Sequence, residues 1–141
     1  MQTLTANEYA FLAELAKAYR DTYLPAIKQI DCWNPRLGVD AICFQPQGGE
    51  CMVGALITPC ELWLVAVPDQ TRLTEPLADA LTLSLPSGAY QLTLDRLLGG
   101  YNLYKRAILF DLSELDSMQE AARLAQQMMA RLMQPVEELH Q

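Results

Sequence analysis

Histidine is nearly missing from this chain, and basic residues are in the minority. The single histidine, His140, stands one residue from the end of the sequence, so a hydrolytic triad or a histidine-based metal site lacks its usual base or ligand. Ten Lys and Arg residues face seventeen Asp and Glu residues, which gives a net charge of −7. This balance argues against binding of nucleic-acid phosphates and suits either a cationic partner or simple solubility.

Long apolar runs are also lacking. No stretch approaches the roughly 18 residues that span a membrane, and residues 1–4 lack the basic segment that opens a secretory signal. We therefore expect a cytoplasmic protein with a single domain over residues 1–141, a length that can bury one sizeable core.

Cysteine is present, but not in a ligand pattern. None of the four cysteines, Cys32, Cys43, Cys51 and Cys60, forms a C-x-x-C pair. We expect no metal site, no cofactor and no disulfide framework, with reduced thiols packed as small apolar side chains. A thiol-dependent metal or redox accessory role for Cys43, Cys51 and Cys60 stays open as an alternative.

Hydrophobic spacing predicts an α+β fold, with a mainly antiparallel sheet of about six strands flanked by N- and C-terminal helices. Strands are expected at residues 39–45, 51–57, 62–67, 81–85, 90–94 and 103–110, and helices at residues 6–23 and 118–133. Capping-box spacing of Thr5 with Glu8, and of Ser117 with Glu120, marks the two helix starts. Pro25 is expected to end the first helix. We expect both helices on one face of the sheet.

Individual residues within these elements lead to further structural predictions. Strict alternation in residues 39–45 separates two faces, one with Val39, Ala41 and Cys43 and the other with Asp40, Ile42 and Phe44. Gly54 interrupts an apolar strand, which indicates a bulge or a close backbone approach. Residues 62–67 are apolar on both faces, so this strand should be central and covered twice. Residues 68–80 should form a loop with one helical turn at residues 75–80.

No group of residues forms a catalytic constellation. Paired carboxylates such as Glu137-Glu138, and Asp111 with Glu114, stand at helix ends or in surface positions. Near a helix N-terminus, Asp and Glu most often complement the helix dipole. Gly48-Gly49 lacks the following Lys-Ser/Thr of a phosphate-binding loop. The sequence therefore gives no reason to expect an enzyme.

Methionine and tryptophan favour a binding role. Met128 and Met129 lie on the last helix, where they either line a flexible peptide-binding surface or fill a wide core face. Trp33 and Trp63 are of the residue type that anchors interfaces, although the apolar strand of Trp63 also suits the core.

Four short motifs follow one another along the chain. They are residues 34–41 (NPRLGVDA), 54–59 (GALITP), 85–90 (LPSGAY) and 100–110 (GYNLYKRAILF). They are similar to the patterns NPAL-x-VEA, G-x-L-[IV]-T-P, FPSG-x-Y and G-x-Y…SLF. In this order and spacing, over about residues 8–132, the chain resembles the HybE/HupJ family of [NiFe]-hydrogenase assembly chaperones. It departs from the family pattern at Cys60, where the family has Trp, and at Asp111-Leu112, where the family has Ser-Pro.

The resemblance implies a cytoplasmic, non-enzymatic assembly chaperone without a cofactor. Its partners would be the hydrogenase small-subunit precursor with its twin-arginine signal peptide, the large-subunit precursor, or both, bound before export. We expect partner contacts at Trp33, Asn34, Pro35, Thr58, Pro59, Cys60, Trp63, Met128 and Met129. A structural homo-oligomeric binding module, such as a homodimer, stays open as a further alternative.

Overall fold

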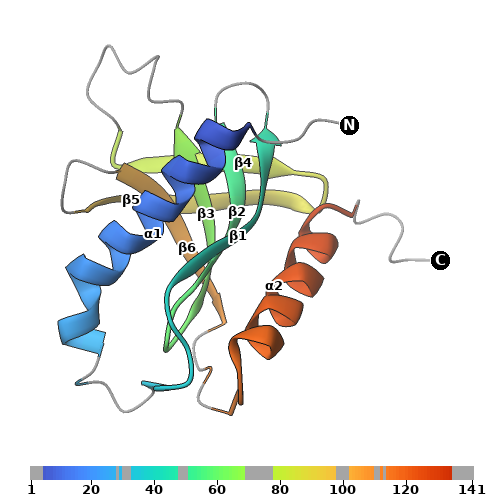
Figure 1. The fold of residues 1–141 in the computed structure, drawn as a ribbon. Coiled ribbons are helices and arrows are strands. Elements are labelled where there is room, and N and C mark those ends of the chain that lie inside the picture. The colour runs from blue at the N-terminus through green and yellow to red at the C-terminus, as the bar shows by residue number, and fades with distance from the viewer. Residues whose placement is uncertain are drawn as a thin grey trace.

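The computed structural model describes residues 5–27, 29, 33–47, 51–68, 78–97, 102–109, 112 and 114–134. The elements of this part of the chain are α1 (Ala6–Ile27), β1 (Asp40–Gln47), β2 (Cys51–Ile57), β3 (Leu62–Pro68), β4 (Ala80–Leu85), β5 (Gly88–Arg96), β6 (Asn102–Leu109) and α2 (Met118–Leu132). The six strands form one antiparallel sheet in the order β1-β2-β3-β6-β5-β4. The β4–β5 hairpin runs at a steep angle to β1, β2 and β3 (Figure 1). The predicted α+β fold is confirmed.

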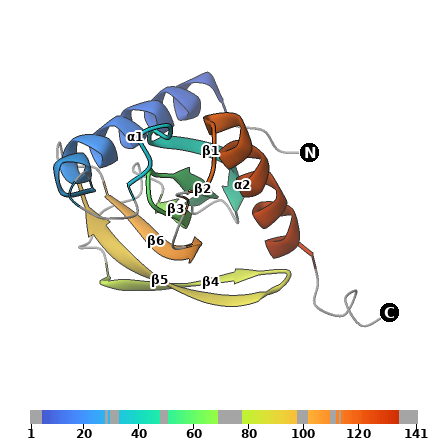
Figure 2. The same ribbon diagram turned by 90° about the horizontal axis from the view of Figure 1, so that it is seen from below.

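The two helices cover opposite faces of the sheet, so the expectation that they share one face is wrong (Figure 2). The core beneath α2 contains Val53, Ala55 and Ile57 of β2 with Leu62, Leu64 and Ala66 of β3, whereas the core beneath α1 contains Leu56, Val65 and Val67. Successive residues of a strand point to opposite faces, so a strand that is apolar throughout requires cover on both sides. The predicted central, doubly covered position of β3 is confirmed.

Both helix starts follow the predicted capping boxes. The Thr5 N–H donates to Glu8 Oε1 at 2.8 Å, and the Glu8 N–H donates to Thr5 Oγ1 at 3.1 Å. At α2, Ser117 Oγ accepts from the Glu120 N–H at 3.2 Å. Pro25 does not end α1, which continues for two further residues. Proline lacks an N–H donor, but its fixed φ suits a helix, so the chain can keep its helical conformation past Pro25.

A bulge in β1 lies opposite Gly54 of β2. The register shifts between Ile42 and Gln45, so the two β1 residues Cys43 and Phe44 oppose Gly54 alone. Cys43 has a φ of 61°, in the left-handed region. The extra residue turns Cys43 toward α2 and Phe44 toward α1, so the predicted alternation is wrong at these two positions. The close approach expected at Gly54 is confirmed, because a Cβ built there would lie 2.8 Å from the Phe44 Cα.

The remaining predictions concern the ends of elements. Residues 69–77 lie outside the described residues, but β4 already begins at Ala80, so the helical turn expected at residues 75–80 is wrong at that end. The hairpin around Pro86-Ser87 is confirmed, with Gly88 at a φ of 144°. On α1, Leu12 and Tyr19 are buried whereas Tyr9, in the first turn, is 58% exposed. Among the described residues, no helix is long and apolar enough to cross a membrane.

Candidate functional site

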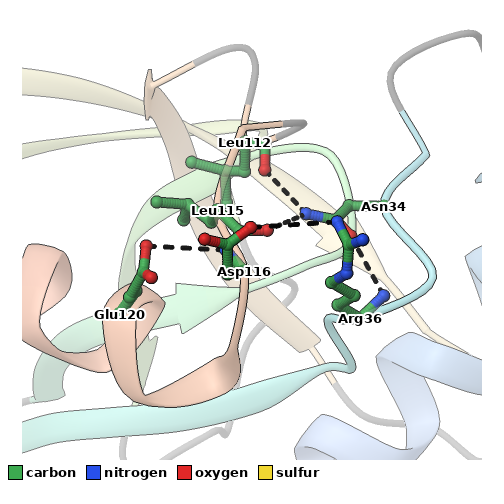
Figure 3. Close-up of polar contacts among 6 residues, drawn as sticks. All are labelled: Asn34, Arg36, Leu112, Leu115, Asp116 and Glu120. Carbon is green, nitrogen blue, oxygen red and sulfur yellow. Dashed lines mark hydrogen bonds and ion pairs between the residues drawn. The ribbon is translucent and has the colours of Figure 1, made fainter.

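Three loops meet around the buried side chain of Asn34 (Figure 3). Its Nδ2 atom donates to the carbonyls of Leu112 and Leu115 at 2.9 and 2.8 Å. Its Oδ1 atom accepts from the Arg36 N–H at 3.0 Å, and its backbone N–H donates to the Pro59 carbonyl at 2.9 Å. One residue therefore ties the approach to β1 both to the β2–β3 corner and to the segment that precedes α2.

The β2–β3 corner is organised by the buried side chain of Thr58. Its Oγ1 atom accepts from the N–H groups of Cys60 and Glu61 at 3.2 and 2.8 Å, and donates to the Glu61 carbonyl at 2.8 Å. The Cys60 carbonyl accepts from the Leu112 N–H at 3.0 Å. The two positions at which the sequence departs from the family pattern are thus joined, and a proline at position 112 has no N–H with which to make this bond.

The corner residues that the sequence pointed to are mostly internal. Asn34, Thr58, Pro59 and Cys60 are buried, whereas Pro35 is exposed and Trp33 is half-buried. Because the hydrogen bonds of Asn34 and Thr58 are made within the chain, the buried part of this corner supports the sheet and fixes the start of α2. Among the predicted contact residues of this corner, Trp33 and Pro35 offer surface to a partner.

A second cluster lies beneath α1 around the ammonium group of Lys105. Lys105 Nζ lies 2.7 Å from Asp95 Oδ2 and 4.4–5.0 Å from the ring centroids of Tyr19, Tyr23 and Trp63. The Tyr23 hydroxyl donates to the Asp95 carboxylate, at 2.6 and 2.7 Å from its two oxygens. The ring of Trp63, which we expected to contact a partner, instead contacts the ammonium group of Lys105. Sequence reasoning missed Lys105 and Asp95, since strand spacing gives no signal that pairs them.

Burial governs the acid–base properties of this cluster. Burial and the nearby Asp95 carboxylate raise the pKa of Tyr19 far above its ordinary value, and burial together with the Asp95 hydrogen bond does the same for Tyr23. Burial also raises the pKa of Glu61, an effect that the Lys105 charge opposes. Both phenols therefore stay neutral at physiological pH, and the cluster holds α1 on β5 and β6.

Met128 and Met129 belong to α2, and their side chains are buried in the core that this helix covers. Met128 also lines a groove of about 440 Å³ between α2 and the end of β6. The lining residues are Ile108, Leu109, Leu124, Gln127, Met128, Arg131 and Leu132. This volume lies within the range of ligand-binding sites, and the walls are apolar except for Gln127 and Arg131.

A smaller hollow of about 240 Å³ continues along α2 toward its N-terminal end. It is lined by Leu115, Glu120, Arg123, Leu124 and Gln127. Leu124 and Gln127 line both hollows, which are therefore neighbours along α2, and we name the two together the α2 groove. Sequence reasoning found Met128, one of its members, but missed the wall that β6 supplies.

The described thiols do not gather into a site. Cys43 and Cys51 are partly buried and Cys60 is buried, while Cys32 lies outside the described residues. Among the described residues, no group of three His, Cys, Asp or Glu side chains is placed to hold a metal ion. Burial raises the pKa of the Cys43 thiol, which lowers its thiolate fraction and its reactivity at neutral pH.

The fold and the α2 groove define a small α+β domain with an apolar trough beside its last helix. Residues 10–141 match the family described as "[NiFe]-hydrogenase assembly, chaperone, HybE". The chain therefore belongs to the HybE family of [NiFe]-hydrogenase assembly chaperones, and the family predicted from its four motifs is confirmed. No curated protein matches the chain at a significant level.

The fold is shared with a solved structure, titled "Solution Structure of HybE from Escherichia coli". The two superpose with a TM-score of 0.67 at 22% sequence identity. The superposition covers 86% of this chain and 76% of that chain. At this level of identity, the similarity establishes the common fold.

Proposed function

We propose that this protein is a cytoplasmic, non-enzymatic chaperone that binds a hydrogenase precursor subunit before export. Contact would be made with the twin-arginine signal peptide of the small-subunit precursor, with the large-subunit precursor, or with both. The observation that carries the proposal is family membership over residues 10–141. Holding an unfinished subunit requires reversible binding and no bond chemistry, which agrees with a site built mainly from apolar side chains.

The α2 groove supports this proposal as the contact surface. A twin-arginine signal has a basic end followed by an apolar run. The net charge of −7 attracts the basic end, and the apolar walls of the groove suit the apolar run. The flexible thioether of Met128 can adapt its shape to different side chains. We place Trp33 and Pro35, beside the loop that leads into α2, at the margin of the same surface.

A pull-down with purified precursor subunits tests the proposal. The immobilised protein should retain at least one precursor at micromolar concentration, and comparison of small-subunit precursor with and without its signal peptide shows which part is held. An unrelated exported precursor serves as the control. If neither hydrogenase precursor is retained more strongly than this control, the proposed function is wrong. The mass of the unliganded protein in solution tests the homodimer alternative in the same preparation.

A further inference from the structure

Strands β5 and β6 are joined along only part of their length. Their ladder consists of four rungs, Thr93–Lys105, Leu94–Tyr104, Asp95–Leu103 and Arg96–Asn102. Beyond Lys105 the two strands separate, and α2 lies across from the gap (Figure 2). Residues 106–109 of β6 and residues 88–92 of β5, all within the described part of the chain, therefore have no ladder partner on the sides that face each other.

Two hydrogen bonds mark the limits of this gap. At the tip of the β4–β5 hairpin, the Ser87 N–H donates to the Leu132 carbonyl at 3.2 Å, which fixes the hairpin to the end of α2. Near the point of separation, the Arg106 guanidinium reaches across to the Gln91 carbonyl at 3.4 Å, in place of a backbone ladder. Because the hairpin is attached to α2 and not to the end of β6, the separation is a built feature of the sheet.

A second bulge shapes the β6 side of the gap. The register passes from the pair Trp63–Ala107 to the pair Leu62–Leu109, so Ile108 is an extra residue in β6. Strict alternation would turn Leu109 toward α1, as it turns Lys105. The bulge instead turns both Ile108 and Leu109 toward α2, and both line the α2 groove. The strand end thus presents two adjacent apolar side chains together with an unpaired backbone edge.

An unpaired strand edge is a template for another extended chain, because its N–H and C=O groups need partners. The β1 edge is protected by its bulge and by Pro46, which has no N–H. The end of β6 contains no proline, and its edge opens onto an apolar trough. We propose that an extended, mainly apolar segment of a hydrogenase precursor binds in the α2 groove by adding as a strand to the free edge of β6. This inference rests on the proposed function and specifies how the partner is bound.

The dimensions of the two walls agree with such a segment. Four strand residues, 106–109, extend about 13 Å at 3.3 Å per residue. On α2, the eight residue steps from Leu124 to Leu132 cover about 12 Å at 1.5 Å per residue. The trough therefore accommodates about four residues in extended conformation. Arg131 is the one formal charge among the residues that line the larger hollow, so uncharged side chains fit best.

A pair of matched substitutions on α2 tests where the precursor binds. Gln127 lines both hollows, whereas its exposed neighbour Gln126 lines neither. Gln127→Trp should fill the trough and weaken precursor binding about tenfold or more, because the displaced segment is the main contact. Gln126→Trp should leave binding unchanged. Both precursor subunits of the pull-down serve as probes, and the circular dichroism of each variant checks its fold.

Amide hydrogen exchange tests the strand pairing itself. Addition of the bound precursor should slow exchange at alternate amides of residues 106–109, whereas the outer edge of β4 should be unchanged. If the precursor binds the wild type but does not protect residues 106–109, the inference is wrong and the proposed function stands. Equal binding by the Gln127→Trp and Gln126→Trp variants would likewise overturn the inference alone. Absence of binding by the wild type overturns the proposed function and, with it, the inference.

Discussion

Lys105 and Asp95 form an ion pair of 2.7 Å beneath α1, between the two strands whose ladder ends beside them. Their side chains are 17% and 11% exposed, so water screens the pair only weakly. The carboxylate also accepts the Tyr23 hydroxyl hydrogen bond, and three aromatic rings surround the ammonium group. The pair is therefore one unit that joins α1, β5 and β6.

Removal of one member of this pair should destabilise the protein strongly. Asp95→Asn leaves the Lys105 charge buried without its counter-ion, and the expected loss is about 3 kcal/mol of unfolding free energy. The double variant Asp95→Asn, Lys105→Met should lose less than the sum of the single variants, because no uncompensated charge remains. Urea unfolding of Asp95→Asn, Lys105→Met and the double variant gives the three free energies. The exposed Arg20–Asp21 pair is the control, where Asp21→Asn should cost under about 0.5 kcal/mol.

Stability should fall steeply in alkaline solution. The pKa of Tyr19 is raised in the folded state by burial and by Asp95, so the native protein keeps this proton at a pH where the unfolded chain, with a pKa of about 10, loses it. Its contribution is complete below pH 10 and is lost as pH rises above it, by at most about 1.4 kcal/mol per pH unit. Denaturant midpoints between pH 8 and 11 should show a shallower decline in Tyr19→Phe than in the wild type. The exposed Tyr9→Phe serves as control, and equal slopes in the three proteins would contradict the assignment.

Asn34 should prove essential for stability. Asn34→Ala removes the donor to two carbonyls, those of Leu112 and Leu115, and the expected cost is about 3 kcal/mol. Asn34→Asp keeps the shape but turns an acceptor toward both carbonyls, so it should be no more stable than the alanine variant. Thermal and urea unfolding check both, with the exposed Gln126→Ala as a near-neutral control. A cost below 1 kcal/mol for both Asn34 variants would show that this residue does not hold the loops together.

Two glycines should differ sharply in their tolerance of alanine. Gly54→Ala places a methyl group against the backbone and ring of Phe44, and relief requires movement of β1, so we expect a loss of about 2–3 kcal/mol. Gly38→Ala meets no atom within 4 Å and should stay within about 0.5 kcal/mol of the wild type. Equilibrium unfolding of the two variants gives the comparison directly. Similar stabilities would mean that the bulge at Cys43 adapts freely.

Local patterns in the sequence were sufficient to predict most of the helices and strands. The capping boxes at Thr5 and Ser117 marked both helix starts, and the β4–β5 hairpin followed from alternation around Pro86-Ser87. These signals are local because the interacting groups lie within a few residues of each other. The extension of α1 past Pro25 was missed because proline usually ends a helix: it lacks the N–H that bonds the carbonyl four residues earlier, and its ring crowds that carbonyl.

Features that depend on pairing between distant strands could not be predicted in this way. A bulge cannot be recognised from the local amino-acid composition. Yet the bulge in β1 turned Phe44 toward α1, and the bulge in β6 turned Leu109 toward α2. The motif at Asn34 was interpreted as a partner contact, since its hydrogen-bond partners lie 78 and 81 residues away along the chain. The β6 wall of the α2 groove was missed for the same reason.

Both walls of the α2 groove come from late in the chain, from residues 108–132. During synthesis, α1 and strands β1 to β3 leave the ribosome first and can begin to associate. The larger hollow has no second wall until α2 has emerged and docked, a step that also satisfies Asn34. A partly translated chain can therefore hold most of its sheet but cannot yet form this hollow.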